Sequence, residues 1–114
     1  MKASRDGHLT LDPLKFRDVY AQDVPPNRTN FLSVAQTPIT KATVDAPAWG
    51  AAWHAKPSYA IVATDDRLLN PDLQRWMYKR AGSQVIEIKA SHALHISQPE
   101  EVAKFIIKAA LEVK

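Results

Sequence analysis

Two residues that suit acid–base chemistry follow two successive strand-like runs of this chain. Asp66 comes after the apolar run 58–64, and His92 comes after the run 84–88. A carboxylate on one imidazole nitrogen fixes the tautomer of the ring, and the other nitrogen can then accept and return a proton. An acid followed by a histidine is the order of the last two members of a hydrolytic triad in strand–turn–helix enzymes. Each residue also has a structural interpretation. Asp65 and Asp66 together fit the solvated end of a strand, and His92 fits a hydrogen-bonded structural histidine.

The segment that must position these two residues has a strand–helix–strand pattern. The run 58–64 is rich in β-forming residues. Asn70 followed by Pro71 predicts a helix start, and Gly82 suits a left-handed position at the end of that helix. The second strand is predicted at 84–88. Such a unit gives parallel strands joined by a right-handed crossover, so Asp66 and His92 are expected to meet at one edge.

The first half of the chain has helix signals separated by prolines. Residues 1–11 are polar and predicted to be extended. Asp12 and Pro13 predict the start of one helix, and the pair at 25–26 ends it and begins a second helix that Pro38 ends. Trp49 and Trp53 are four residues apart and are predicted to share a helical face. They either line an apolar substrate cavity or anchor a loop by burial, and we favour burial for at least one of them.

The last helix has the clearest local signal. Residues 97–100 (SQPE) fit a capping box with Ser97 as the cap. The apolar residues of the predicted stripe recur at helical spacing: Val102, Phe105, Ile106, Ala109 and Ala110.

Composition limits the class of protein. The chain has 114 residues, a net charge of +3 and no cysteine, which fits one domain at most without disulfides. Basic residues are scattered among acids, so we expect no nucleic-acid partner, and the apolar runs are too short to span a bilayer.

His92 and His95 lack a further ligand at a metal-site spacing, and no metal or other cofactor is predicted. These features are compatible with the cytoplasm, which is the location we predict.

Segment 57–112 resembles the C-terminal end of α/β-hydrolase-fold enzymes, in the branch of small esterases. The resemblance is carried by 62–67 (VATDDR), 70–77 (NPDLQRWM) and 90–99 (ASHALHISQP). In that family the acid lies in a Gly-x-x-Asp turn, a position that Asp66 takes, with Ala63 in place of glycine. Serine and proline follow the family's histidine five and seven residues on, as Ser97 and Pro99 follow His92. Residues 6–13 (DGHLTLDP) resemble part of the family's helical cap. The resemblance implies that Asp66 and His92 are catalytic.

The chain departs from the family pattern at the nucleophile. It contains no Gly-x-Ser-x-Gly sequence, and its glycines are Gly7, Gly50 and Gly82. No nucleophile elbow can therefore be built from it, and the family's oxyanion-hole motif is also missing. By this resemblance, the chain alone is not expected to carry out serine hydrolysis.

These observations predict a partial α/β-hydrolase fold with a short parallel sheet and N-terminal cap-like helices. We expect residues 1–56 to form a cap-like helical segment and 57–114 the C-terminal core segment. The predicted function is to supply the acid and the histidine for cleavage of a small-molecule ester or amide. The alternative is a non-catalytic interaction module derived from a hydrolase. Because two parallel strands leave an open edge, we expect a homo-oligomer or a complementing N-terminal hydrolase segment as partner, and no membrane.

Overall fold

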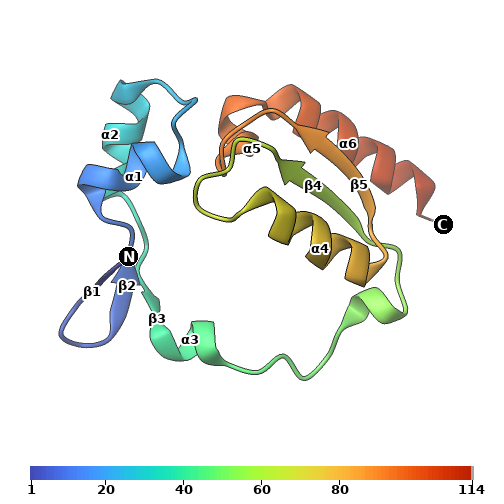
Figure 1. Cartoon of the computed structure of the whole chain (residues 1–114), viewed down its shortest axis with the longest axis horizontal. Coiled ribbons are helices and arrows are strands. Elements are labelled where there is room, and N and C mark those ends of the chain that lie inside the picture. The colour runs from blue at the N-terminus through green and yellow to red at the C-terminus, as the bar shows by residue number, and fades with distance from the viewer. Residues whose placement is uncertain (114) are drawn as a thin grey trace.

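The computed structural model describes residues 1–113 and contains a strand–helix–strand unit in its second half (Figure 1). Strand β4 (Tyr59–Ala63) pairs in parallel with β5 (Gln84–Ile88), with Ile61 opposite Ile86. Helix α4 (Pro71–Ala81) is the crossover between them. The short parallel sheet of a partial α/β-hydrolase fold is therefore confirmed.

Local signals fix both ends of α4. The Asn70 side-chain oxygen accepts hydrogen bonds from the N–H groups of Asp72 at 2.8 Å and Leu73 at 3.4 Å, as expected for a helix cap. Gly82 follows the helix at φ 65°, a left-handed conformation that glycine adopts without steric cost. The return to β5 therefore begins at the predicted residue.

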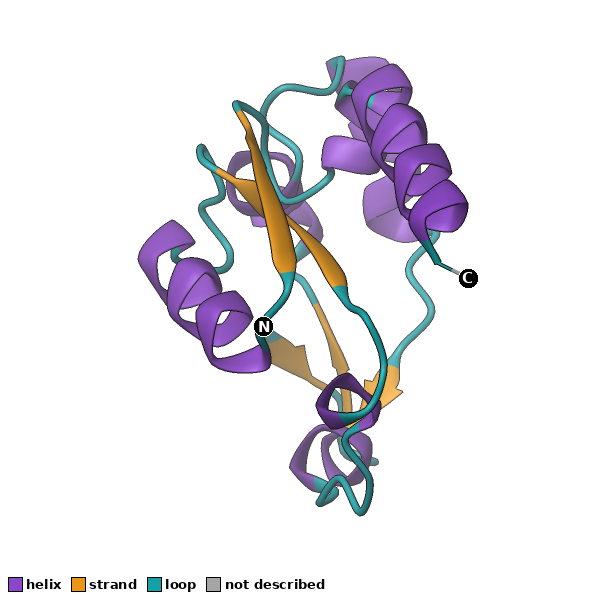
Figure 2. Cartoon of the chain, turned by 90° about the vertical axis from the view of Figure 1, so that its right-hand side faces the viewer, coloured by secondary structure: helices purple, strands orange, loops and turns teal. Residues whose placement is uncertain are grey.

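Two helices cover opposite faces of the strand pair, with α4 on one side and α6 (Pro99–Glu112) on the other (Figure 2). Phe105 of α6 is buried and its ring meets that of Tyr59 edge-on, with 6.1 Å between the ring centroids. Other apolar residues of α6 are exposed, among them Ile106 at 60% and Leu111 at 80%. Only part of the predicted apolar stripe is therefore covered within this chain.

The capping box predicted for α6 is wrong. Ser97 is the last residue of the short helix α5 (Leu94–Ser97), and Gln98 occupies the cap position of α6 without a side-chain hydrogen bond. The Ser97 hydroxyl is buried and makes no hydrogen bond to any described residue. Ser97 cannot act as the cap because its backbone already belongs to the preceding helical turn.

The first half of the chain contains a small antiparallel sheet and several short helices. Strand β2 (His8–Thr10) lies between β1 (Lys2–Ala3) and β3 (Ile39–Thr40). The helical elements are α1 (Pro13–Tyr20), α2 (Pro26–Val34), α3 (Lys41–Asp45) and the 3₁₀ turn η1 (Ala52–His54). Asp12 caps α1 by accepting the Leu14 N–H at 3.1 Å, as predicted. The extended start was predicted, but its pairing with β3 was not.

A buried apolar cluster joins the two halves of the chain. Phe16, Ala21 and Val24 are buried together with Ala93, and Leu11, Tyr20, Leu32 and Ile96 pack around them. Because Ala93 follows His92 directly, packing of the N-terminal helices holds the turn that carries the histidine.

Neither Trp49 nor Trp53 is buried, so the predicted burial of at least one of them is wrong. Trp49 is 94% exposed in an irregular loop, and Trp53 is 41% exposed in η1. They do not share a helix, because the helical turn spans only 52–54. Trp53 instead lines a surface hollow of about 270 Å³ with Met77 and Tyr78 of α4. No helix among residues 1–113 is both long and apolar enough to cross a membrane.

Candidate active site

The structure brings Asp66 and His92 together at the carboxyl ends of β4 and β5. His92 Nδ1 lies 2.7 Å from Asp66 Oδ2. The Asp66 side chain is only 2% exposed, whereas that of His92 is 35% exposed. The pair therefore has a buried acid and a ring that reaches the surface.

Both oxygens of Asp66 accept hydrogen bonds. Oδ1 accepts the backbone N–H groups of Leu68 at 2.8 Å and Leu69 at 2.9 Å. Oδ2 accepts the Gln74 amide at 2.8 Å as well as facing His92. An ionised carboxylate can only accept, so Nδ1 is the donor in this contact. The neutral His92 ring then carries its proton on Nδ1 and has a free electron pair on Nε2.

Gln74 orients the carboxylate and was missed by the sequence reasoning. It is 3% exposed, and its Oε1 accepts the N–H of Ala63, the last residue of β4, at 3.2 Å. Its Nε2 donates to Asp66 Oδ2 and to the carbonyl of Leu69, both at 2.8 Å. One sequence signal could have indicated this role. Gln74 is a polar residue directly after Leu73, in a helix predicted to pack on a strand.

The exposed side of His92 is bordered by the N-terminal half of the chain. The Tyr20 ring lies 5.3 Å from the His92 ring, measured between centroids. Nε2 makes no hydrogen bond within residues 1–113, and no serine hydroxyl there bonds to the ring. With its side chain 35% exposed, the His92 ring is partly open to solvent.

Two surface hollows share residues with this pair or its neighbours. One of about 490 Å³ is lined by Asp66 together with Thr64, Arg67 and Lys89, among others. The second, of about 360 Å³, is largely apolar and is lined by the following residues: Leu11, Phe16, Tyr20, Leu32, Ala35, Gln36, Thr37, His95 and Ile96. The second hollow offers space for an apolar substituent beside the Tyr20 ring.

Three of the four serines in the second half make structural hydrogen bonds. The Ser58 and Ser83 hydroxyls bond to each other at 2.8 Å where the two strands begin. Ser91 is fully buried, and its Oγ accepts the Ala93 N–H at 3.1 Å.

His95, the second histidine after β5, is exposed. Within residues 1–113, no three His, Cys, Asp or Glu side chains are grouped so that they could hold a metal ion.

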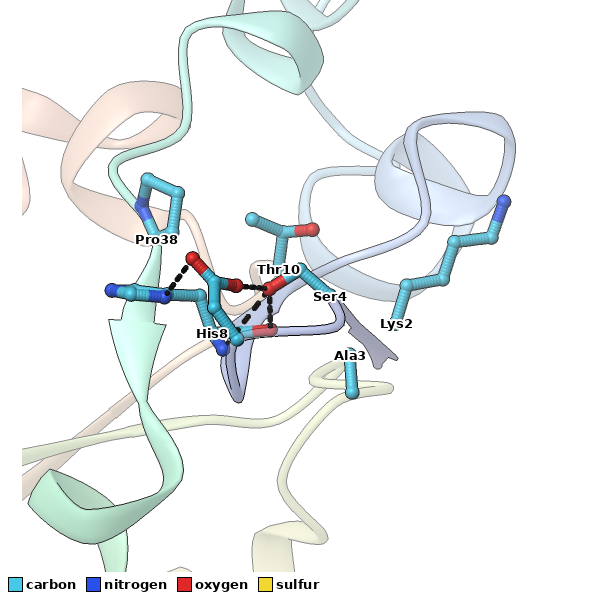
Figure 3. Close-up of a pocket in the computed structure, with 7 residues that line it drawn as sticks. Lys2, Ala3, Ser4, His8, Thr10 and Pro38 are labelled. Carbon is cyan, nitrogen blue, oxygen red and sulfur yellow. Dashed lines mark hydrogen bonds and ion pairs between the residues drawn. The ribbon is translucent and has the colours of Figure 1, made fainter.

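A second set of serine, acid and histidine lies on the N-terminal hairpin (Figure 3). Ser4 Oγ donates to the Asp6 carboxylate, whose other oxygen is 3.0 Å from His8 Nδ1. Ser4 Oγ also accepts the His8 backbone N–H at 3.1 Å. The serine hydroxyl thus bonds to the carboxylate and to the histidine backbone, and the imidazole does not face it as it would in a Ser-His-Asp triad. This cluster stabilises the turn at Gly7.

Comparison with known protein families identifies the family of this chain. The model of the alpha/beta hydrolase family matches residues 3–105, and the chain belongs to that family. No curated protein matches the chain.

Proposed function

We propose that this chain supplies the acid, Asp66, and the base, His92, of an ester- or amide-cleaving site. The observation that carries the proposal is the 2.7 Å contact between the buried Asp66 carboxylate and Nδ1 of the His92 ring, whose side chain is 35% exposed. The nucleophilic serine comes from a segment outside residues 1–114, because the chain has no Gly-x-Ser-x-Gly sequence.

Each step follows from the position of the proton on the ring. Nε2 of His92 takes the proton of the serine hydroxyl while the serine oxygen bonds to the substrate carbonyl carbon. The resulting imidazolium donates that proton to the leaving alcohol or amine as the carbon–heteroatom bond breaks. Asp66 stays ionised and stabilises the imidazolium. Water then attacks the acyl carbon while His92 Nε2 takes its proton, the bond between that carbon and the serine oxygen breaks, the proton returns to the serine, and the carboxylic acid product is released. The apolar hollow beside Tyr20 favours a substrate with an apolar substituent.

The incomplete sheet supports a complementing segment as partner. Within the described residues β4 pairs only with β5, so its other edge has no strand partner. On α6, Ile106 and Ile107 are each about 60% exposed. A hydrolase segment that adds a strand to β4 would satisfy that edge and bring a serine to the same end of the sheet.

The same open edge favours a second candidate, a non-catalytic module that associates with its own copies. Two strands alone are marginally stable, and pairing of β4 edges around a twofold axis would extend the sheet. Size-exclusion chromatography with light scattering tests association. A compact monomer at every micromolar concentration would contradict this second candidate.

Reconstitution tests the first candidate. The chain is co-expressed with an N-terminal α/β-hydrolase fragment that carries a Gly-x-Ser-x-Gly turn, and p-nitrophenyl ester cleavage is measured. We expect no activity from the chain alone, activity from the complex, and loss of that activity in His92→Ala. His54→Ala, which removes an exposed histidine of η1, is the matched control and should leave the activity unchanged. Equal activity of the His92→Ala and parent complexes would overturn the proposal.

A further inference from the structure

A single short segment, residues 18–23, contacts the residues on either side of both Asp66 and His92. We call it the clamp segment. It comprises the end of α1 and the turn that follows, and it lies beside the turns after β4 and β5 (Figure 1). Four hydrogen bonds join it to these two turns, and none of the four involves Asp66 or His92 directly, although the Tyr20 ring lies beside the His92 ring.

Two of these bonds hold the turn around Asp66. The Gln22 amide donates to the carbonyl of Asp65 at 2.6 Å. Arg67 Nη1 donates to the carbonyl of Asp18 at 3.3 Å. The residues immediately before and after the acid are therefore both bound to the clamp segment.

The other two bonds hold the turn around His92. The Asp23 carboxylate accepts the N–H of Ser91 at 2.9 Å, and the Tyr20 carbonyl accepts the N–H of Ala93 at 3.0 Å. Ser91 and Ala93 are both fully buried, so these N–H groups have no access to water as an alternative partner. Asp23 itself is solvent-accessible.

The physical origin of the clamp lies in how a helix ends. The last carbonyls of an α-helix have no partner within the helix. In α1 two of them, on Asp18 and Tyr20, are used by the turns that carry the acid and the histidine. Ala21 is fully buried and Val24 is 1% exposed, so packing anchors the segment while its polar groups face the two turns.

From these contacts we propose that the clamp segment sets the position of His92 relative to Asp66, with Asp23 as its principal positioning residue. This proposal rests on the proposed function, because acid–base catalysis requires a fixed position of His92 relative to Asp66. Asp23 has this role because its carboxylate is the only side chain among the described residues that accepts the Ser91 N–H. Partial burial raises the pKa of Asp23, but the hydrogen bonds from Ser91 outweigh this and hold the pKa below its usual value.

The test compares variants of the full chain by NMR. In Asp23→Ala the Ser91 amide loses its acceptor, and we expect its hydrogen exchange to accelerate about tenfold, as for loss of one bond to a charged group. We also expect the signal of the proton between His92 Nδ1 and Asp66 to weaken, while amides of the β4–β5 pair keep their protection. Asp18→Ala is the matched control, because the clamp uses only the backbone carbonyl of that residue.

A conservative variant covers the case in which Asp23→Ala does not fold. Asp23→Asn keeps an oxygen that can accept the Ser91 N–H, so it should fold and retain the Nδ1 proton. The proposal is overturned if Asp23→Ala gives the Ser91 exchange rate and Nδ1 signal of the parent, or if folded Asp23→Asn loses that signal. Neither readout needs catalysis, so these results are independent of the ester assay that tests the proposed function.

Discussion

The amide of Gln74 and the imidazole of His92 bind the same oxygen of Asp66, at 2.8 Å and 2.7 Å. The carboxylate is thus held between a helix that covers the sheet and a turn that follows it. Because the Gln74 oxygen also accepts the N–H of Ala63, the amide cannot rotate without losing a bond to the strand. Gln74 therefore fixes the direction in which Asp66 presents its oxygen to the histidine.

Replacing this amide by an apolar side chain of similar size should cost stability. Gln74→Leu leaves the Ala63 N–H and one lone pair of Asp66 without partners, and about 2 kcal/mol of unfolding free energy is expected to be lost. Urea unfolding followed by circular dichroism measures this change. Gln98→Leu is the control, since Gln98 is exposed. Equal unfolding midpoints for the two variants would count against the role assigned to Gln74.

The acid should matter for catalysis far more than for folding. In the reconstituted complex, Asp66→Asn is expected to lower the ester-cleavage rate by about 10⁴-fold, because an amide favours the wrong tautomer of His92. Asp65→Asn, which changes the exposed neighbouring acid, should have little effect. The assay is p-nitrophenyl ester cleavage at matched complex concentration. Comparable losses in the two variants would contradict the assignment of the acid.

A side chain at Gly82, in the turn between α4 and β5, should lower the stability of the chain. Gly82 has φ +65°, and a Cβ there strains the backbone although nothing lies within 4 Å of it. Gly82→Ala is expected to destabilise the chain by about 1 kcal/mol. Gly50 also has open space but lacks a positive φ, so Gly50→Ala should be neutral or slightly stabilising. Thermal unfolding of both variants checks this difference, and an equal destabilisation would show that φ is not the cause.

Low pH should weaken the attachment of the clamp segment to the turn that carries His92. The pKa of Asp23 is lower in the folded chain than its usual value of 3.8, despite partial burial that raises it. The unfolded chain therefore binds the proton more readily, and the stabilising contribution of this carboxylate is complete above about pH 4 and falls below that. Urea unfolding at several acidic pH values should show a smaller loss of stability in Asp23→Asn than in the parent. Parallel pH curves for the two chains would exclude this contribution.

The strand–helix–strand unit could be predicted because its signals are local. Asn70 and Gly82 mark the ends of α4 by their own backbone preferences, and the two β-rich runs lie on either side. Asp66 and His92 were predicted to meet because the carboxyl ends of parallel neighbours share an edge. Their catalytic role stays a prediction.

Local sequence patterns did not predict the contacts between residues that lie far apart in the chain. Asp23 and Ser91 are 68 positions apart, and nothing in either local sequence indicates their pairing. Gln74 was overlooked because its burial depends on the nearby Asp66 carboxylate. The tryptophans were placed by a general preference for burial, which Trp49 does not follow in this chain. Their surroundings depend on tertiary packing that local spacing does not determine.

The ¹⁵N spectrum of the His92 ring, at a pH where the ring is neutral, measures directly which ring nitrogen carries the proton. We expect a protonated Nδ1 and an unprotonated Nε2, since an ionised Asp66 can only accept the bond at Nδ1. In Asp66→Asn, a shift toward the tautomer with its proton on Nε2 is expected. A parent chain whose neutral His92 carries its proton on Nε2 would contradict the claim that Asp66 prepares this histidine to act as a base.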